Sequence, residues 1–379
     1  MEERRGSFQL GYVFSLMEAD SVFLQDRTEA EYFLQKGHSI TVIAGSEVAK
    51  QEERALLPSG MHAILLPVKL IGFGTVRFPY VPRLVPVLSN LSLDIIHLNS
   101  HLHPTAIQTL RAVHRMRRPL VVTVHGVLAK RGVASEILQR VWLHLVGRLL
   151  WRNATVVLCL TSSDASELRR YGCPRSKIRI IPNGVDVNRF RATGSLDGNV
   201  LVWAGRFVPE KGLIYLVEAL HLVAKRYPAV RLVMAGDGPE RERISHLVRQ
   251  RGLDANVSFL GSVSWSRMPE VFNSGSIFLI PSLKEGMPYA LLEAMACARA
   301  VVASSIPAMR SLLTHRKEGL LVPPGDPRAL ADAITELLAD PELRKRLGQA
   351  SREYVESRHA HEVIARELEQ VYLEAMQTK

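Results

Sequence analysis

Two carboxylates, Glu285 and Glu293, lie eight residues apart in the segment "EGMPYALLEAMA". Eight residues are about two turns of a helix, so both side chains can face the same cleft. Glu293 lies in an otherwise apolar run, where an unpaired carboxylate would be costly to bury, and we expect it to have a hydrogen-bonding partner. A ribose diol fits that requirement. An exposed salt-bridging pair is the alternative interpretation, and the apolar setting argues against it.

Cations and a helix start follow other predicted strands. Gly205, Arg206 and Lys211 lie in "GRFVPEKGL", directly after the apolar run "LVWAG". The glycine permits a sharp turn, and the two cations could neutralise a diphosphate. Pro288 favours a first helical turn, and the N-terminus of that helix offers free N–H groups to an anion. Ligands of doubly wound sheets bind beyond the carboxyl ends of the strands, so these loops are the expected site.

Short apolar runs alternate with amphipathic helical stretches along the whole chain, which is typical of parallel sheets built from βαβ units. In the first half we predict strands near residues 8–14, 39–45, 61–67, 94–99, 119–125 and 155–161. In the second half we predict the strands "NVLVWAG", "VRLVMAG", "VSFLG", "SIFLIPS", "AVVAS" and "GLLVPP" in a doubly wound order, with helices near 212–226, 238–251, 288–298 and 327–338.

A length of 379 residues fits two α/β domains of near-equal size, and two domains imply a cleft. The segment 187–199, "VNRFRATGSLDGN", has no apolar period and contains Gly and Ser, so we place the linker there. The predicted domains are residues 1–190, residues 191–357, and a last helix over 358–379 that returns to the N-terminal domain.

The composition excludes several classes of protein. There is no uncharged apolar run of about 18 residues, so we predict no transmembrane helix. The N-terminal stretch resembles a first strand more than a signal peptide, which predicts a cytoplasmic protein. The three cysteines are far apart and predict neither a disulfide framework nor a zinc site. The net charge is +11, and the excess lies in residues 1–191, with 25 Lys and Arg against 15 Asp and Glu.

Five segments together carry a resemblance to a known family: "PNGVD", "GRFVPEKGL", "GDGPE", "VSFLG" and "EGMPYALLEAMA". In this order they resemble the retaining glycosyltransferases of family 4, which have the GT-B fold of two Rossmann-like domains facing across a cleft. The likeness covers nearly the whole chain and is strongest over residues 178–326. It implies a donor that is a nucleotide-diphosphate sugar, bound by the C-terminal half, and an acceptor bound by the N-terminal half.

The resemblance also implies roles for individual residues. Arg206 and Lys211 would hold the donor diphosphate, Glu293 the ribose hydroxyls and Glu285 the hydroxyls of the transferred sugar. Backbone N–H groups from Met287 to Ala290 would meet the phosphates and sugar, and the turn from Gly261 to Val263 would hold the base. The implied donor-binding residues are Gly205, Arg206, Lys211, Gly261, Val263, Glu285, Gly286, Met287, Pro288, Tyr289, Ala290 and Glu293.

Histidines follow two strands of the first half. His125 in "TVHG" lies at a strand end, and by the resemblance it would lie beside the donor sugar and belong, with Glu285, Arg206 and Lys211, to the catalytic residues. His97 fits a structural role equally well. A metal site with His101 and His103 lacks a third ligand nearby. Because there is no Asp-x-Asp motif, we expect the leaving diphosphate to be stabilised by protein cations and a helix N-terminus, with no metal or other cofactor.

The sequence departs from the family in its first loop. Family members usually have a Gly-Gly turn after the first strand, where this chain has "SLMEADSVFLQ" with Glu18 and Asp20. Two other functions therefore stay open. One is a nucleotide-sugar-binding or partner subunit without transfer activity, and the other is a phosphorylase or epimerase of the same architecture, although no pyridoxal-phosphate lysine is identifiable.

A basic stretch in the first half points to the acceptor. In "SEILQRVWLHLVGRLLWRN", Arg140, His144, Arg148 and Arg152 follow one another at four-residue steps, which predicts one basic helix face. Apolar residues lie between them, so the segment could rest on a membrane with its cations toward anionic headgroups. Packing of the apolar stripe onto the sheet is the alternative. We predict a lipid-linked or otherwise anionic acceptor, and no nucleic acid, because the charge is unsupported by any nucleic-acid-binding motif.

Overall fold

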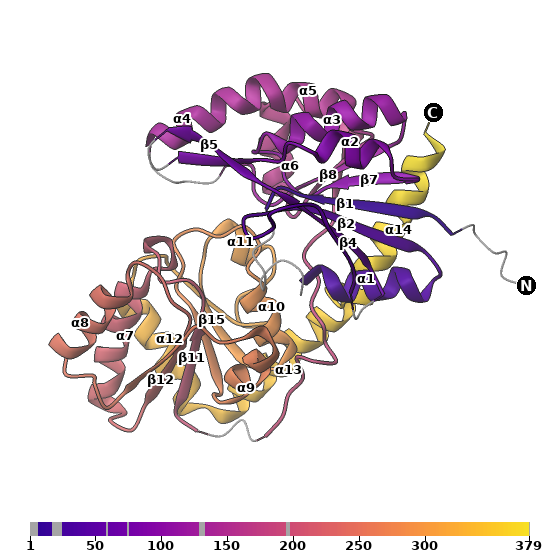
Figure 1. The fold of residues 1–379 in the computed structure, drawn as a ribbon. Coiled ribbons are helices and arrows are strands. Elements are labelled where there is room, and N and C mark those ends of the chain that lie inside the picture. Colours follow the sequence, from indigo (N-terminus) through magenta and orange to yellow (C-terminus); the bar gives the residue numbers. More distant parts are fainter. Residues whose placement is uncertain are drawn as a thin grey trace, which may run out of the picture. The chain divides into compact units, whose positions relative to one another are not determined.

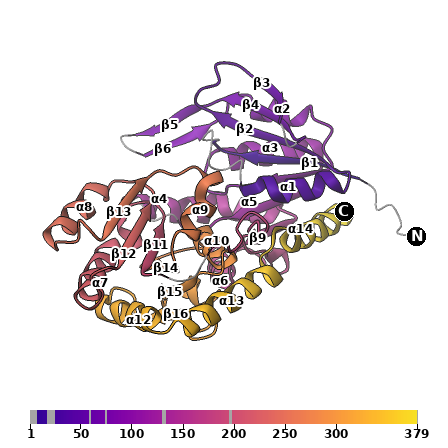
Figure 2. The same ribbon diagram turned by 90° about the horizontal axis from the view of Figure 1, so that it is seen from below.

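The computed structural model describes residues 7–16, 25–57, 60–73, 76–128, 133–194 and 198–378. The chain forms two compact units (Figures 1 and 2). The first unit ends at Pro182 and resumes at Ile364, and the second unit comprises Asn183–Val363. The sequence-based boundaries, after residues 190 and 357, differ from these by a few residues, and the segment 187–199 expected as a linker belongs to the second unit.

The second unit is built on a six-stranded parallel sheet. Its strand order is β13-β12-β11-β14-β15-β16, so the chain starts in the middle, builds one side and then crosses over to build the other. The strands are β11 (Val200–Ala204), β12 (Arg231–Ala235), β13 (Val257–Gly261), β14 (Ile277–Ile280), β15 (Ala300–Ser304) and β16 (Leu320–Val322). All six strands were predicted, in the predicted doubly wound arrangement.

Helices cover this sheet and bury its apolar side chains, among them Trp203, Met234 and Leu279. The helices are α7 (Leu213–Arg226), α8 (Arg241–Gln250), α9 (Met268–Asn273), α10 (Tyr289–Ala296), α11 (Pro307–Arg310), α12 (Pro327–Ala339) and α13 (Pro341–Arg358). The starts of α12 and α13 follow from the sequence, because Asp326 and Asp340 accept backbone N–H bonds before a first-turn proline.

The first unit has an eight-stranded sheet in the order β10-β9-β8-β7-β1-β2-β4-β3. Every neighbouring pair is parallel except β3 with β4. The strands are β1 (Gln9–Phe14), β2 (Ser39–Ser46), β3 (Glu53–Leu56), β4 (His62–Pro67), β7 (Ile95–Leu98), β8 (Leu120–Val124), β9 (Val156–Cys159) and β10 (Ile178–Ile180). A separate antiparallel hairpin joins β5 (Lys69–Phe73) to β6 (Val76–Tyr80). The predicted α/β class with two doubly wound sheets is therefore confirmed.

The helices of the first unit are α1 (Gln25–Gln35), α2 (Leu84–Ser89), α3 (Thr105–Met116), α4 (Val133–Trp142), α5 (Arg148–Asn153), α6 (Ser162–Arg170) and α14 (His361–Gln377). A π-helical turn, Leu143–Gly147, joins α4 to α5, so that the two form one continuous helical stretch. In the described part of the chain, no helix is long and apolar enough to span a membrane.

The sequence missed the strands that lack a continuous apolar run. All four residues of β3 are exposed, and β10 is a three-residue strand with two exposed residues. Both lie at the edges of the sheet, where only one side pairs with a neighbour, so little apolar burial is needed to keep them there. The hairpin β5–β6 forms outside the sheet, and its formation depends on local pairing that the period of hydrophobic residues does not reveal.

The C-terminal helix α14 packs into the core of the first unit. Ile364, Leu368 and Val371 are buried in the same cluster as Leu10 and Phe33. The parts of the chain that meet here are separated by more than 300 residues in sequence. Their contact therefore fixes the first unit through a long-range interaction.

A buried polar chain runs through this contact. The hydroxyl of Tyr372 lies 2.6 Å from His97 Nδ1 and 2.8 Å from the hydroxyl of Tyr12. The other ring nitrogen of His97 lies 2.6 Å from Thr123 Oγ1. Burial lowers the pKa of His97 to about 3, so the ring is neutral at physiological pH and each nitrogen has a partner. The structure gives His97 a structural role.

Replacing Tyr372 with Phe tests how much this chain stabilises the first unit. The ring is retained, but the buried His97 and Tyr12 groups lose a partner, so we expect the free energy of unfolding to fall by about 1–3 kcal/mol. Denaturant unfolding, followed by circular dichroism, measures the loss. Tyr354→Phe is the matched control, because the hydroxyl of Tyr354 makes one 3.3 Å bond, to the carbonyl of Ser311 at the surface. Equal effects of both variants would contradict the proposed importance of the buried chain.

Candidate functional site

The second unit offers a ligand site where the order of its strands reverses. β11 lies between β12 and β14, so the loops after β11 and β14 leave the sheet side by side and run to opposite sides. Such switch points form a crevice beyond the carboxyl ends of the strands. The predicted residues Gly205, Arg206 and Lys211 follow β11, and Glu285 follows β14.

Backbone hydrogen bonds tie the loops at this edge together. The amide of Gly205 donates to the carbonyl of Ala235 over 3.0 Å, and the amide of Gly236 donates to the carbonyl of Gly261 over 2.7 Å. Gly261 is the first residue of the predicted base-binding turn, so this turn is hydrogen-bonded directly to the loop after β12. Gly236 is required here, because a Cβ atom would lie 1.8 Å from the carbonyl oxygen of Gly205.

The structure pairs Lys211 with Glu285. Lys211 Nζ lies 2.6 Å from Glu285 Oε1, and the hydroxyl of Ser282 donates to the same oxygen over 2.7 Å. The neighbouring loop backbone enforces this contact, because Leu283 donates to the carbonyl of Glu210 and a Cβ atom on Gly212 would lie 2.2 Å from the carbonyl oxygen of Pro281. The predicted cation and the predicted sugar-binding carboxylate are therefore adjacent.

Arg206 and the start of α10 complete the predicted anion site. Arg206 is exposed and makes no side-chain hydrogen bond or ion pair with any residue that the structure describes. Pro288 is the N-cap of α10 in extended conformation, one residue before the helix, rather than in its first turn. The preceding Met287 is held by Asn183, whose side-chain amide donates to its carbonyl over 2.9 Å. Asn183 comes from the "PNGVD" segment, and it fixes the approach to the helix.

Glu293 is buried in α10 with 7% of its surface exposed. One carboxylate oxygen, Oε1, accepts the indole N–H of Trp265 over 3.2 Å. Among the described residues no side chain bonds to the other oxygen, which leaves it available to a ligand. Burial raises the pKa of Glu293 to about 7, against the effect of the indole bond. The hydrogen-bonding partner expected for Glu293 is therefore Trp265, and it engages one of the two carboxylate oxygens.

The remaining predicted donor residues lie after β13 and at the start of α10. Gly261, with φ +68°, ends β13 and turns the chain toward Val263, which is half-buried. Gly286 is exposed, and Tyr289 and Ala290 are the first two residues of α10. The first amides of any helix lack an intrahelical acceptor, which makes this end suitable for an anion.

His125 belongs to the first unit. It follows β8, is exposed, and its Nε2 atom is hydrogen-bonded to Asn99 Oδ1, at the end of the neighbouring strand β7. Its position beside a donor sugar stays a prediction. The altered first loop, with Glu18 and Asp20, lies outside the described residues.

The other histidines of the first unit have protein partners. His101 is buried, and its Nε2 atom is 3.2 Å from the carbonyl oxygen of Val127. His103 Nδ1 is 3.2 Å from Ser100 Oγ. Across the part of the chain that the structure describes, no group of three or more His, Cys, Asp or Glu residues could hold a metal ion.

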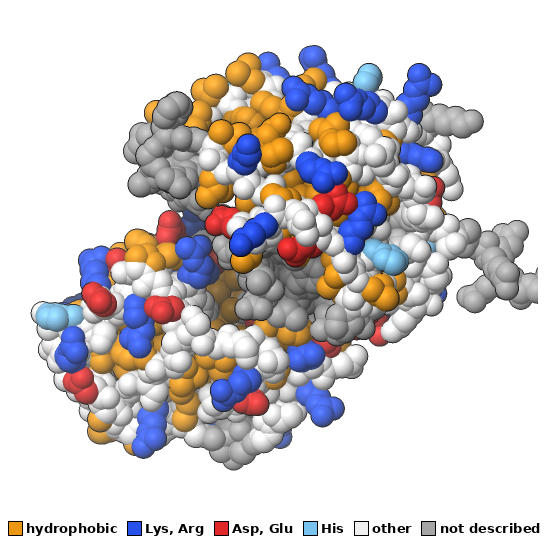
Figure 3. Space-filling model, viewed as in Figure 1, with side chains coloured by type: hydrophobic (Ala, Val, Ile, Leu, Met, Phe, Trp, Pro, Cys, Tyr) orange, Lys and Arg blue, Asp and Glu red, His pale blue; other side chains and the backbone are white. Residues whose placement is uncertain are grey.

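The basic stretch of the first unit forms two rows along α4, the π turn and α5. Arg140, Arg148 and Arg152 are exposed, and Arg140 is paired with Glu136 over 2.6 Å. The predicted alternative, in which the apolar residues pack onto the sheet, holds for the buried Trp151, and Trp142 is half-buried. The other predicted apolar residues are exposed. The exposed apolar side chains, hereafter the apolar stripe, are Ile137 at 58%, Leu138 at 47%, Val141 at 49%, Leu145 at 69% and Leu149 at 50%. Figure 3 shows hydrophobic side chains gathered over α4 and α5, bordered by Lys and Arg.

A π turn, Leu143–Gly147, lies in the middle of the stretch that carries both rows. Residues four apart drift around an α-helix with 3.6 residues per turn, and a wider π turn offsets part of that drift. Arg140 and His144 line one pocket of about 240 Å³ with Glu167, Arg170 and Tyr171, and Arg148 lies near Gly172. The end of α6 therefore adds one basic and one acidic residue, Arg170 and Glu167, beside the predicted basic face.

Sequence reasoning missed Trp265 and Ser282. Trp265 in "SVSWSRM" has an ordinary aromatic position after a strand, and nothing in its spacing from Glu293, 28 residues away, signals a contact. Ser282 lies three residues before Glu285, a spacing that could have suggested a local hydrogen bond.

Comparisons with known proteins agree with this arrangement. The family model Glycosyltransferase Family 4 matches residues 27–189, and the model Glycosyl transferases group 1 matches residues 186–354. Phosphatidyl-myo-inositol mannosyltransferase of Mycobacterium tuberculosis is 29% identical over 365 residues, 90% of each chain. Alpha-D-kanosaminyltransferase of Streptomyces kanamyceticus is 30% identical over 250 residues, 61% of this chain and 64% of that enzyme, so the match spans just under two thirds of that relative.

Among solved structures, HepE of Anabaena in complex with UDP and glucose has the same fold. Its TM-score is 0.79 at 18% identity, over 97% of this chain and 100% of that one. The two family models together cover residues 27–354, and they divide the chain close to the boundary between its two units. The chain belongs to the group 1 glycosyltransferases of family 4, enzymes of the GT-B fold.

Proposed function

We propose that this glycosyltransferase moves a hexose from a nucleotide-diphosphate sugar to an acceptor hydroxyl, with retention of the anomeric configuration, and that the second unit binds the donor. The observation that carries the proposal is the Lys211–Glu285 pair at the switch point of the parallel sheet, close in sequence to the start of α10. The complex of HepE with UDP and glucose supports a nucleotide-linked donor for this fold.

The leaving diphosphate would compete with Glu285 for Lys211. The diphosphate and the carboxylate of Glu285 would both pair with the ammonium group of Lys211. Because a diphosphate carries more negative charge than a carboxylate, donor binding draws Lys211 away from Glu285. Glu285 then keeps its bond from Ser282 on Oε1, and without the lysine its carboxylate can accept the hydroxyls of the transferred sugar. Arg206 supplies a second cation that no described residue neutralises.

The same groups would stabilise the transition state. As the bond to the anomeric carbon breaks, negative charge grows on the diphosphate, and Lys211, Arg206 and the N-terminus of α10 meet it without a bridging metal ion. The acceptor attacks on the face that the diphosphate leaves, and a diphosphate oxygen takes the acceptor proton. His125 would lie beside the donor sugar, and Glu293 would accept the ribose hydroxyls.

Two substitutions test the donor site. Lys211→Ala removes a cation that acts on the leaving group, and we expect kcat/KM to fall about 100-fold or more. Glu293→Gln removes a charged acceptor of the ribose hydroxyls, and we expect a loss of about tenfold. Release of nucleoside diphosphate from UDP-, GDP- and ADP-sugars measures both, after a thermal-shift screen has selected the donor that stabilises the protein.

Lys225→Ala is the matched control, because Lys225 is an exposed cation in the last turn of α7. It should leave turnover unchanged. Wild-type kcat/KM in both donor-site variants, with folded protein, would sink the assignment. Donor binding without release of nucleotide in the presence of acceptors would instead favour a binding subunit.

Chelation tests the role given to the cations. Since Lys211, Arg206 and the helix N-terminus would neutralise the diphosphate, we expect EDTA to change the rate less than twofold. Turnover measured with and without EDTA, on the same preparation, decides this. Complete loss of transfer that manganese or magnesium restores would show that a metal ion carries the charge.

We propose further that the acceptor is lipid-linked or otherwise anionic, and that the first unit docks on a membrane surface. The apolar stripe supports this, because five large apolar side chains stay about half or more exposed along one helical stretch. Continuous apolar surface of this kind marks an interaction site. The neighbouring row of Arg140, Arg148 and Arg152 would meet anionic headgroups, each cation contributing about 1 kcal/mol near such a surface. The mannosyltransferase of M. tuberculosis, named for a phosphatidylinositol substrate, fits the same acceptor class.

Vesicle sedimentation tests the membrane proposal. We expect the protein to bind phosphatidylglycerol vesicles at low ionic strength and to be released at high ionic strength, because salt screens the arginine row. Replacing Arg140, Arg148 and Arg152 with Gln should weaken binding at low salt, and Leu145→Glu should weaken it at both salt concentrations. Leu222→Glu is the control, since Leu222 is an exposed apolar residue on α7 of the second unit. Binding that is absent at low salt, or unchanged in the arginine variant, would remove the membrane proposal and leave the transferase intact.

A further inference from the structure

Trp265 joins the predicted ribose-binding carboxylate to the segment that enters the second unit. The residue begins a short 3-10 turn, Trp265–Arg267, after β13. Its indole N–H donates to Glu293 Oε1 over 3.2 Å. The bond is directional and fixes one oxygen of the carboxylate, so the second oxygen has a defined orientation.

The other side of the indole is held by two consecutive residues of the entering segment. The guanidinium of Arg189 lies 4.3 Å from the centroid of the Trp265 ring, and the ring of Phe190 lies 5.8 Å away in a T-shaped arrangement at 67°. A cation over an indole face and an edge-to-face aromatic pair both stabilise a ring in one position.

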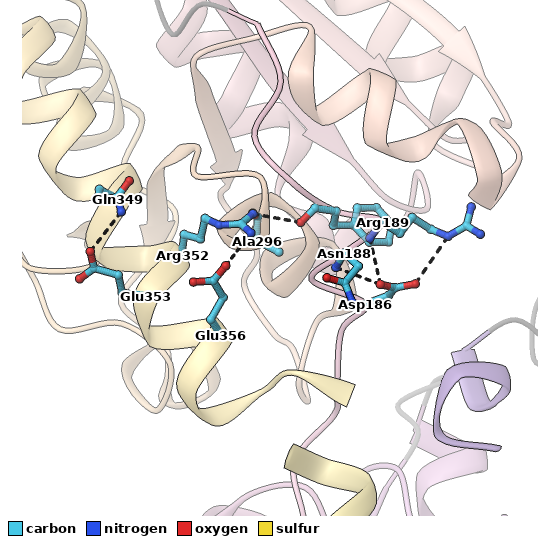
Figure 4. Close-up of polar contacts among 9 residues, drawn as sticks. Asp186, Asn188, Arg189, Ala296, Gln349, Arg352, Glu353 and Glu356 are labelled. Atoms are coloured by element: carbon cyan, nitrogen blue, oxygen red, sulfur yellow. Dashed lines mark hydrogen bonds and ion pairs between the residues drawn. The ribbon is translucent and has the colours of Figure 1, made fainter. Parts of the chain in front are cut away.

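These two residues are themselves fixed (Figure 4). Asp186 Oδ1 accepts the backbone amides of Asn188 and Arg189 over 3.0 and 2.9 Å, and Asp186 Oδ2 lies 3.8 Å from Arg189 Nε. The carbonyl of Phe190 accepts from Arg352, which also donates to the carbonyl of Ala296 at the end of α10. The segment, the indole and the helix that carries Glu293 therefore form one connected cluster.

We propose that Trp265 is a positioning residue for the donor: its indole, clamped by Arg189 and Phe190, orients Glu293 so that the second carboxylate oxygen accepts the hydroxyls of the ligand. The inference rests on the proposed donor site and deepens it. Trp265 acts through Glu293, and the substrate contact is made by the carboxylate.

The indole matters for the charge of Glu293, because the other surroundings of this carboxylate favour its protonated form. Burial disfavours the carboxylate and raises its pKa, and the bond from Trp265 is the described interaction that favours the charged form. Charged and titratable groups on the elements around α10 are Cys297 at its end, Arg299 before β15, Arg352 on α13 and Glu270 on α9, which is exposed and paired with Arg267. None of them is hydrogen-bonded to the carboxylate in the described structure.

The sign of the pH dependence follows from this arrangement. If the ligand hydroxyls need the carboxylate, donor affinity rises with pH through the pKa of Glu293, about 7. Loss of the indole N–H removes stabilisation of the charged form, so the pKa rises and the affinity profile moves to higher pH. A merely structural loss would weaken binding at every pH by the same factor.

Trp265→Phe tests the inference, with UDP as the calorimetric probe from pH 5.5 to 9, or GDP or ADP where one of these stabilises the protein instead. We expect the midpoint of the affinity profile to rise by about one pH unit and affinity at pH 7 to fall up to about tenfold, with recovery toward wild type at pH 9. Arg189→Gln, which keeps the indole N–H, should shift the midpoint in the same direction by less. Glu293→Gln has no carboxylate at this position, so its affinity profile shows how protonation of the nucleotide alone changes binding. Trp142→Phe is the matched control, because it loses an indole bond to the carbonyl of His101 in the first unit.

Thermal unfolding against pH, without nucleotide, separates this inference from the proposed function. A folded pKa raised from 4.5 to about 7 means that stability from the protonated carboxyl is full below pH 4.5 and is lost as pH rises through 7. In Trp265→Phe the loss should extend to higher pH. Identical pH profiles of wild type and Trp265→Phe, in stability and in binding, would overturn the inference and leave the donor site standing. Failure of every nucleotide to bind the wild type would overturn the proposed function and, with it, the positioning role.

Discussion

The close approach of backbone segments at the carboxyl ends of β11, β12 and β14 is the constraint on which the candidate site depends. Gly236 faces the carbonyl oxygen of Gly205 where a Cβ would lie 1.8 Å away, and Gly212 faces that of Pro281 at 2.2 Å. No other residue type fits such contacts without moving one of the loops. Because Lys211 and Glu285 stand on these same loops, their 2.6 Å contact follows from backbone packing as much as from their opposite charges.

The sequence predicts this part of the molecule well, for a physical reason. The central strands β11, β14 and β15 are buried on both faces, so each of them appears in the sequence as a continuous apolar run. Once the strands are parallel, their ends must meet at one edge, which brings Lys211 and Glu285, 74 residues apart, within reach. The sequence could not predict that the two side chains pair with one another when no ligand is bound.

Other features depend on tertiary contacts that carry no periodic signal. The indole of Trp265 reaches Glu293 only because α9 and α10 pack together, and the polar chain of Tyr372, His97 and Tyr12 requires α14 to meet β1 and β7. The apolar stripe shows the opposite limit. Its hydrophobic residues have the spacing of a core-facing helix. The side of the stretch that faces the core instead carries Leu150 and Trp151, which are fully buried.

The electrostatic balance of α10 explains where an anion is needed. The carbonyl of Ala296 accepts from Arg352 and that of Cys297 from Arg299 over 2.6 Å, so protein cations already meet the partial negative charge at the C-terminus of the helix. The first turn contains no acidic residue. Glu285, the nearest carboxylate before the helix in sequence, is engaged by Lys211 and Ser282. Within the described residues, the partial positive charge at the N-terminus is therefore not met by a first-turn carboxylate. A diphosphate placed there would meet the helix dipole and would compete for Lys211 at the same time.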